Sequence, residues 1–598
     1  MKTHRGVPVH MLAAGIALVT IGCTNPTLQP AATEPNAASS SIPPGLSAPF
    51  AYGVASGDMT SDSAVLWTRT PGPASVTPEL SLTPSFDHPR TLPAAIASEA
   101  SDFTVKVLAT ELQAGTRYFF RFRAGGDISP VGSFRSAYAP DQHAAVRMVF
   151  TGDADWKWKP YPILASLVQE NADFFLFLGD LIYESTDYEA KSVVEDLRGY
   201  RFKYRENREP RANSASRMVP MRDLYAAFGQ YSVFDNHETG MSMANRDGPR
   251  YTEGGARFKG GYVNHTEGFR ARIRAYREYQ PVREEVHADT GDSRTDETGR
   301  FYRAVGWGAN VEMIVLDDRS YRDVRLPSSD DPAATSCTRT MLGPVQLKWL
   351  EDALHAAKRR NAVWKVVVIS SPIQEFGVAS QVGVEMDGFK SWAGTYRCER
   401  NKILKFIDDH AIDNVVFLTT DNHYTAINNL AYETVPDDRR SARRPARNAF
   451  EIMTGPLGAV TGTPPYGRKF DIKGLPRREA DRRILSVWNG ESVDDQGQLM
   501  GLRQASLDPI GLEANFPGLE AFSIRSAGGR PGVVEPLAFA SFNSYSYAVL
   551  TFDQSHLHVL VKTMPAVADP STLLKTDAER EYESRRAEET FSFTVRAQ

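Results

Sequence analysis

Four short clusters of carboxylate, amide and imidazole side chains each follow a strand that the sequence predicts. In chain order they are Gly152-Asp-Ala-Asp155, Gly179-Asp-Leu-Ile-Tyr183, Asp235-Asn-His-Glu238 and Thr420-Asp-Asn-His423. Taken singly, each has an ordinary structural explanation, such as a turn, a solvated loop, a helix cap or a buried histidine. Four such clusters, each after a predicted strand, favour one shared site, because side chains at the carboxyl ends of strands in an α/β sheet meet at the same edge.

The ligand types in these clusters predict a dinuclear metal centre. Two cations roughly 3.5–4 Å apart need a bridging carboxylate and further nitrogen or oxygen ligands on each side. Mixed carboxylate, imidazole and amide ligands suit two divalent or trivalent ions such as Fe, Mn, Zn or Ca, and do not suit soft Cu(I). Because such a pair of ions binds phosphate and activates water, the clusters point to phosphoryl chemistry.

An α/β domain with a covered sheet must position these clusters. Apolar strands are predicted at 146–151, 173–178, 231–234, 311–316, 364–369 and 414–419, with helices at 161–170 and about 344–359. Continuous apolar strands that alternate with helices are typical of sheets covered on both faces. We place this domain at 145–565, closed by strands at 544–552 and 556–562, with polar insertions or lids near 184–300 and 433–535. Residues 566–598 are predicted to be a charged tail with a surface helix.

The segment before this domain has a different residue pattern. Residues 49–140 contain short alternating strands and turns, which predict an all-β domain of immunoglobulin or fibronectin type. Residues 24–48 are rich in Pro, Ala, Ser and Thr and are interpreted as a flexible linker.

Residues 1–23 have the pattern of an export signal. Lys2 and Arg5 precede an apolar run that is too short to span a membrane stably. The run ends at Cys23 after small residues, as in a bacterial lipoprotein cleavage site, and plain secretion is the alternative. We therefore expect a periplasmic or cell-surface protein, joined to the membrane by a lipid on Cys23.

Composition excludes several classes of protein. The 598 residues are 41% hydrophobic and 24% charged, which is ordinary for a globular chain. The net charge of −5 argues against a general nucleic-acid binder. Three cysteines exclude a disulfide scaffold, and a disulfide between Cys337 and Cys398 is permitted in an oxidising compartment but left open.

The ordered motifs resemble the calcineurin-like metallophosphoesterases, and more closely the alkaline phosphatase D, or PhoD-like, family. The resemblance rests on Val54-Ala-Ser-Gly-Asp58, Ala64-Val-Leu-Trp-Thr-Arg69, Leu178-Gly-Asp-Leu-Ile-Tyr-Glu184, Phe234-Asp-Asn-His-Glu238, Leu316-Asp-Asp-Arg-Ser-Tyr-Arg322, the run Met341–Leu350 and Phe417-Leu-Thr-Thr-Asp-Asn-His423. It implies a metallophosphoesterase sandwich, in which helices flank two sheets, behind an N-terminal β domain.

The resemblance also implies a role for each motif residue. Asp180 would bridge the metals, Asp153, Tyr183 and His423 would bind the first, and Asn236 and Asp421 the second. His237 and Glu238 would lie beside the phosphate, with His237 as a proton donor; Asn236 would also contact substrate. Arg319 would orient loops or touch phosphate, and a buried ion pair with Asp317 or Asp318 is the alternative.

Three departures from the family pattern change the expectation. Asp153 stands where many members have Cys, which makes the site harder. Lys390 stands two residues before Trp392, where an Asp is proposed to hold an additional calcium, so we expect two metals. Lys390 would instead attract phosphate, or lie on the surface without a role. The signal lacks the family's paired arginines, so we expect metal loading after export.

The resulting prediction is an exported metal-dependent phosphoesterase that hydrolyses phosphate esters with a hydroxide held at a dinuclear site. A phosphodiesterase or phospholipase-D-like hydrolase is the first alternative, since the same fold hosts both chemistries. A non-catalytic surface-binding protein is the second. The motifs leave metal identity, substrate and oligomeric state open.

Overall fold

The computed structural model describes residues 49–188, 192–211, 218–240, 251–326, 331–373, 392–438, 440–461, 491–493, 499–501, 537–541, 544–567 and 569–598. Within it, residues 48–598 form one compact unit. The predicted signal, linker and lipidation site at Cys23 lie outside the described residues, as do Lys390 and most of the predicted insertion at 433–535.

A mixed nine-stranded sheet carries three of the four motif clusters. Its strand order is β26-β25-β24-β10-β11-β12-β1-β2-β6. Strands β10, β11 and β12 run parallel at its centre, and β24 pairs antiparallel with β10. The bounds are β1 Val54–Gly57, β2 Ala64–Arg69, β6 Thr104–Ala109, β10 Val146–Thr151, β11 Phe174–Phe177, β12 Gly229–Ser232, β24 Ser544–Phe552, β25 His556–Pro565 and β26 Glu588–Arg596.

A seven-stranded sheet carries the fourth cluster. Its order is β15-β16-β17-β18-β20-β19-β23, and β16, β17, β18 and β20 run parallel. The bounds are β15 Arg303–Trp307, β16 Val311–Val315, β17 Trp364–Val368, β18 Val415–Thr419, β19 Thr425–Glu433, β20 Arg443–Met453 and β23 Leu537–Ser541. Two short ribbons, β13 Arg257–Phe258 with β14 Gly261–Tyr262 and β21 Glu491–Val493 with β22 Leu499–Gly501, stand apart.

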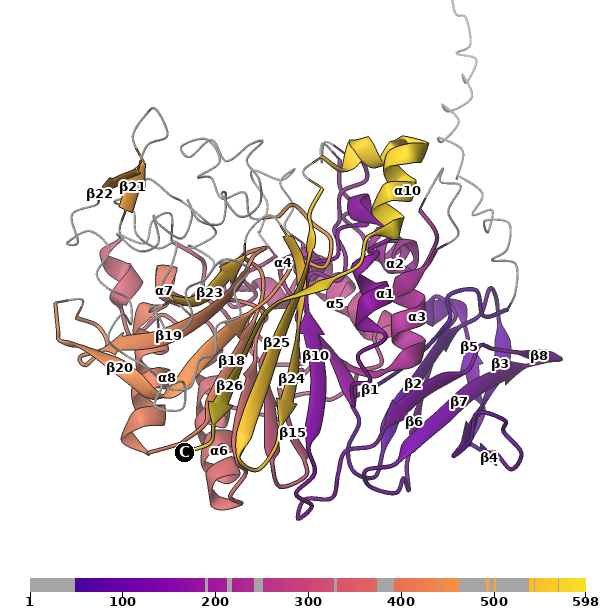
Figure 1. The fold of residues 1–598 in the computed structure, drawn as a ribbon, viewed down its shortest axis with the longest axis horizontal. Coiled ribbons are helices and arrows are strands. Elements are labelled where there is room, and N and C mark those ends of the chain that lie inside the picture. The colour runs from indigo at the N-terminus through magenta and orange to yellow at the C-terminus, as the bar shows by residue number, and fades with distance from the viewer. Residues whose placement is uncertain are drawn as a thin grey trace, which may run out of the picture. The chain divides into compact units, whose positions relative to one another are not determined.

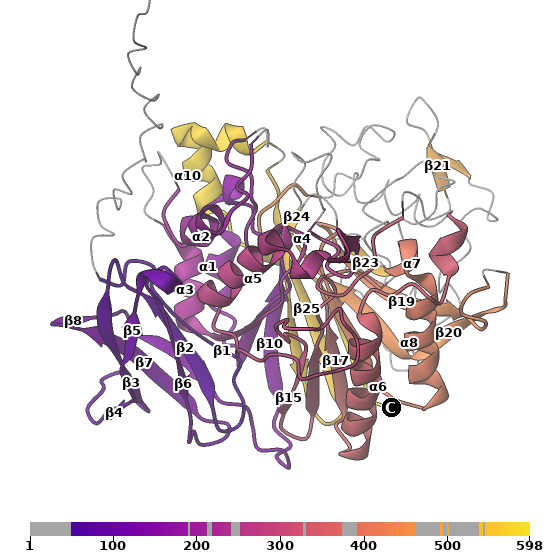
Figure 2. The same ribbon diagram turned by 180° about the vertical axis from the view of Figure 1, so that it is seen from behind.

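The two large sheets pack face to face, with helices on both outer faces. Alternation in β10 shows how: Met148 and Phe150 enter a core shared with β16, β17 and β18, whereas Val149 faces the helices. Helices α1 (Ile163–Leu167), α2 (Leu197–Glu206), α3 (Pro220–Ala227), α5 (Glu267–Tyr279) and α10 (Thr576–Ser584) cover the nine-stranded sheet. Helices α6 (Gly343–Arg359), α7 (Trp392–Thr395) and α8 (Arg397–Asp409) cover the other sheet. Figures 1 and 2 show α6 and α8 on one side of the paired sheets and α1, α2 and α5 on the other.

The N-terminal part is rich in strands, as predicted, but it is joined to the α/β part through a shared sheet. A six-stranded sheet holds β3 Ala74–Ser81, β4 Arg90–Thr91, β5 Ala95–Ala97, β7 Arg117–Ala124, β8 Asp127–Ile128 and β9 Gly132–Arg135. Strands β1, β2 and β6 extend the nine-stranded sheet instead, because β1 pairs with β12 at Ser56 and Gly229. The immunoglobulin-like topology stays a prediction.

Two predictions about surface segments were wrong in part. The described residues of 184–300 form a packed layer, not a lid, since the apolar faces of α2, α3 and α5 bury tyrosines against the sheet. The charged tail has its predicted helix, α10, but then continues into β26 at the edge of the nine-stranded sheet. Phe593 and Val595 of β26 are buried, and the acidic residues before them concealed this alternation.

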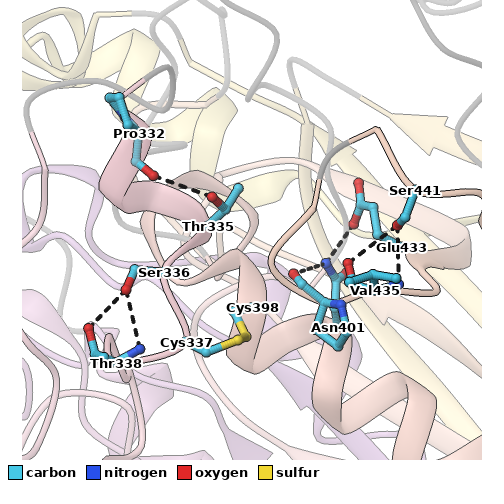
Figure 3. Close-up of a disulfide and its surroundings, with 11 residues drawn as sticks. Pro332, Thr335, Ser336, Cys337, Thr338, Cys398, Asn401, Glu433, Val435 and Ser441 are labelled. Atoms are coloured by element: carbon cyan, nitrogen blue, oxygen red, sulfur yellow. Dashed lines mark hydrogen bonds between the residues drawn. A yellow bond between two sulfur atoms is a disulfide. The ribbon is translucent and has the colours of Figure 1, made fainter.

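The disulfide left open by the sequence is present. Cys337 and Cys398 are bonded, with their Cα atoms 5.1 Å apart, and they tie the segment before α6 to the first turn of α8 (Figure 3). The bond thus spans 61 residues of sequence on the outer face of the seven-stranded sheet. Among the described residues, none of the helices combines the length and apolar character that crossing a membrane requires.

Candidate metal centre

The motif side chains converge between the carboxyl ends of the two sheets. Asp153 follows β10, Asp180 follows β11, Asn236 opens α4 (Asn236–Thr239) after β12, and Asp421 and His423 follow β18. Backbone hydrogen bonds join the loops, with the N–H of Asp153 donating to Gly179 O at 3.1 Å and that of Thr420 to Ser370 O at 2.9 Å. The Thr420 hydroxyl donates to Asp153 Oδ2 at 2.5 Å and so links the loops of one sheet to those of the other. The loops of both sheets therefore form one continuous rim.

Two overlapping groups of ligand-type atoms lie in this rim. The first group is Asp153, Asp180 and His423, and the second group is Asp180, Asp235 and Asp421. Within each group the ligand atoms lie within 4.8 Å of one another. Asp180 belongs to both groups, so its carboxylate lies where a bridging ligand must be.

His423 presents one defined ring nitrogen to the first group. Its Nδ1 lies 2.5 Å from the carbonyl oxygen of Val460, an acceptor, so Nδ1 carries the hydrogen. Its Nε2 faces inward, 3.4 Å from Asp153 Oδ1 and 3.0 Å from the hydroxyl of Tyr183. When a metal displaces the Nε2 proton, an imidazole held in this way offers the Nε2 lone pair as a ligand.

The backbone in these loops is strained. Asp153, Asp180, Asp421 and His423 have φ of 63°, 52°, 68° and 59°, the left-handed region that non-glycine residues seldom adopt. Such conformations cost of order 1–3 kcal/mol each and gather at functional sites. Gly455 (φ 121°) supports the arrangement from β20, since an added Cβ would lie 2.6 Å from Asp153 Oδ2.

The second group contains a residue that the sequence reasoning missed. Asp235 is fully buried and pairs through Oδ1 with Arg319. Asn236, the amide predicted to bind the second metal, is also fully buried, with Oδ1 3.5 Å from Arg319 Nη2. A tetrapeptide with four polar residues does not say which of them faces the site, so Asp235 had no distinguishing signal.

The described residues fit cations in both groups. Asp153 Oδ1 and Asp235 Oδ2 are buried oxygens with no hydrogen-bond partner among the described residues, and each belongs to a different group. Burial, together with neighbouring carboxylates, raises the pKa of Asp180 to about 6 and that of Asp235 well above its usual range. Burial lowers the pKa of His423, but Asp153 and the other carboxylates outweigh it and raise the pKa to about 9. This crowding of buried negative charge calls for positive partners.

His237 lies beside the two groups and is held by a second missed residue. Its Nδ1 contacts Glu184 Oε2, and its ring lies over that of Tyr183, with centroids 3.9 Å apart. Its Nε2 lies 3.9 Å from Asp180 Oδ2, and 14% of its side chain is exposed. Burial raises the pKa of Glu184, but His237 more than offsets it, so the pKa lies below its usual value. Glu184 was visible in the sequence only as the residue after Tyr183.

Glu238 has a structural role that does not fit the predicted place beside the phosphate. Its side chain is fully buried, and its two oxygens accept hydrogen bonds from the backbone N–H groups of Asp180, Leu181, Ile182 and Asp235. It closes a capping box at the start of α4. Glu238 is therefore a structural clamp between the loops after β11 and β12.

Arg319 forms buried ion pairs, as the alternative prediction for this residue stated. Its closest partner is Asp235. Its side chain is fully buried and pairs with Asp235, while Asp318 Oδ1 and Asp421 Oδ2 lie 3.8 and 3.7 Å away. Because it bonds two carboxylates of the second group, it positions ligands. The expected ion pair with Asp318 is present, although Asp235 is the closer partner. Asp317 instead accepts hydrogen bonds from the backbone N–H groups of Arg319 and Ser320.

Comparison with known proteins gives a consistent assignment. The PhoD-like phosphatase family model matches residues 148–505, and the model of the N-terminal domain of PhoD-like phosphatases matches residues 36–138. Alkaline phosphatase D of Bacillus subtilis (strain 168) is 28% identical over 416 residues, which are 64% of this chain and 66% of that protein. A solved structure of PhoD superposes with a TM-score of 0.64 at 21% identity, over 92% of this chain and 91% of that one. The chain belongs to the PhoD-like phosphatase family.

Proposed function

We propose that this chain is a metal-dependent phosphoric ester hydrolase that uses two metal ions. The observation that carries the proposal is the pair of overlapping ligand groups that share Asp180. Such a pair of cations would neutralise the charge of a phosphoryl group and activate water. The ligand set, which contains carboxylates and one imidazole, is compatible with Fe, Mn, Zn or Ca.

Residues around the two ligand groups hold the ligands in place. Asp180 is fixed for a bridging role, since its Oδ1 also accepts the backbone N–H of His237 at 3.0 Å. The clamp made by Glu238 holds Asp180 and Asp235 in place through their backbones. Arg319 sets Asp235 and Asn236 side by side. Substrate is thus met by a pre-organised rim, which saves the reorganisation that catalysis would otherwise require.

His237 is the proton donor in this proposal. With Nδ1 held by Glu184, its Nε2 points toward the shared ligand Asp180 and is the part that a leaving group can reach. A proton held at Nε2 passes to the ester oxygen as the phosphorus–oxygen bond breaks, so the alcohol leaves neutral. Glu184 positions the imidazole and favours its protonated form.

The test is hydrolysis of p-nitrophenyl phosphate and bis-p-nitrophenyl phosphate across pH, by metal-loaded chain that lacks residues 1–23. We expect Asp180→Asn to fold and to lose activity by several orders of magnitude. Asp577→Asn is the control, because that carboxylate is fully exposed on α10. Wild-type turnover in Asp180→Asn contradicts the proposal. Preference for the diester moves the substrate class to phosphodiesters.

Export and anchoring remain part of the proposal. The signal pattern that ends at Cys23 supports a lipid anchor and a periplasmic or cell-surface location. Blocking lipoprotein processing with globomycin should make a precursor accumulate, as judged by gel mobility. A chain that matures normally in its presence contradicts lipidation.

A further inference from the structure

A second cluster of metal-type ligands lies at the far end of the nine-stranded sheet. Asp553 lies in the turn between β24 and β25, and His556 and His558 lie in the first residues of β25. Because β24 runs antiparallel to β10, with Val146 opposite Phe552, this turn lies beyond the amino end of β10. The centre described above lies beyond its carboxyl end, a six-residue strand or about 20 Å away. Figure 1 shows the β24–β25 turn at the lower end of the strands and α4 near their upper end.

Strand geometry sends the two imidazoles to one face. His556 and His558 are two residues apart in β25, so their side chains point the same way, and their rings stack with centroids 5.7 Å apart. His556 Nδ1 lies 4.0 Å from Asp553 Oδ1, and His558 Nε2 lies 4.0 Å from Asp553 Oδ2. The three ligand atoms lie within 4.8 Å of one another.

Neighbouring groups fix the orientation of two of these side chains. Thr594 of β26 holds His558 through a hydrogen bond of 2.9 Å to Nδ1, so the other nitrogen, Nε2, faces the aspartate. Asp553 Oδ1 accepts the backbone N–H groups of Ser555 and His556 at 2.6 and 2.7 Å, which leaves Oδ2 toward His558. An imidazole whose second nitrogen bonds a neighbour is the usual arrangement of a metal ligand.

We propose that Asp553, His556 and His558 bind one divalent transition-metal ion of the zinc type. Two imidazoles and a carboxylate suit such ions, whereas Mg²⁺ and Ca²⁺ prefer oxygen ligands. Bond lengths of about 2.1 Å in a tetrahedron put ligand atoms about 3.4 Å apart, so the 4.0 Å separations need only a small side-chain movement. The side chains are 39–53% exposed and have room for it. Three protein ligands leave a position open for water or an added ligand.

Another histidine pair in the chain supplies a matched control. His355 of α6 and His410 after α8 have ring centroids 4.7 Å apart, closer than the rings of His556 and His558. Among the described residues, this pair is not joined by a carboxylate into a three-ligand group. Comparing the two pairs therefore separates a built site from the general affinity of neighbouring imidazoles for metals.

The experiment measures bound zinc per chain, after equilibration in micromolar free zinc, in chain that lacks residues 1–23. We expect His556→Ala/His558→Ala to bind one zinc fewer than wild type, with p-nitrophenyl phosphate turnover unchanged. Asp180→Asn should keep this zinc, and His355→Ala/His410→Ala should match wild type. Thr594→Val keeps all three ligands and should weaken the affinity about tenfold. Equal zinc content in wild type and His556→Ala/His558→Ala, or an equal loss in His355→Ala/His410→Ala, overturns the proposal.

Discussion

Replacing Arg319 by methionine should destabilise the fold by more than it weakens substrate binding. The guanidinium is fully buried, pairs with Asp235, and has Asp318 and Asp421 within 4.0 Å. Methionine fills much of the same space without charge, so Asp235 is left buried without its cation. Breaking a buried pair in this way costs about 3–5 kcal/mol.

That magnitude is large enough to measure in several ways. At about 1.4 kcal/mol per factor of ten, a loss of 3–5 kcal/mol shifts the folding equilibrium by about a hundredfold or more. Urea unfolding should show the loss. Metal-free protein should lose more stability than metal-loaded protein, because cations in the second group offset the unpaired charge of the buried Asp235. Steady-state kinetics on p-nitrophenyl phosphate should be measured on the same samples.

Arg322→Met is the control, because Arg322 is equally buried but pairs with Asp318 at 3.0 Å. Asp318 belongs to neither ligand group found among the described residues. We expect Arg322→Met to be destabilised to a similar extent, with the same loss in metal-free and metal-loaded protein. The reasoning fails if Arg319→Met raises KM and leaves the unfolding free energy within about 0.5 kcal/mol of wild type, a change typical of surface substitutions. Arg319 would then bind phosphate.

Three further predictions rest on the same structure. Glu184→Gln should lower kcat about tenfold to a hundredfold, because His237 loses the contact that orients it, and the metal content should not change. An unaltered kcat in a steady-state assay would remove Glu184 from the mechanism. Gly455→Ala should reduce the amount of bound metal and lower the unfolding free energy in urea by about 1–3 kcal/mol, because the added methyl group contacts Asp153 Oδ2 and φ is positive at this position. Wild-type metal content and wild-type unfolding free energy would show that the loop adapts. Burial lowers the pKa of His287 to about 4, below its unfolded value, so the stability this residue contributes is present above about pH 6.5 and lost as pH falls toward 4. His287→Gln should therefore lose less unfolding free energy than wild type between pH 7 and pH 5, and parallel profiles would refute this.

The fold was predictable where strands are buried on both sides. Continuous apolar runs such as 146–151 and 414–419 are strands in the structure, and the helix expected at 344–359 is α6. Pairing between distant strands leaves no local trace, so the joining of β1 to β12 across the two predicted domains could not be read from residue patterns. The edge strand β26 was hidden because an edge strand carries polar residues and is buried on one face only.

The candidate site was predictable in its location and less so in its roles. Ligand-type residues just after strands identified Asp153, Asp180, Asp421 and His423 as neighbours, and the structure brings them together. A carboxylate that binds metal and one that accepts backbone N–H groups look alike in sequence. Glu238 was therefore predicted beside the phosphate and Asp235 was given no role, since burial and the direction of a side chain depend on tertiary contacts.

The position of β10 has a consequence for how the molecule is made. Arg147 of β10 and Thr551 of β24 are hydrogen-bonded neighbours that lie 404 residues apart. At about 5–20 residues per second, a ribosome needs about 20–80 s to supply the second strand after the first. During that interval the central strand that leads to Asp153 has an open edge, which invites pairing with other nascent chains. We expect yield to depend on chaperones that cover this edge, and any early stop before β24 to give insoluble protein.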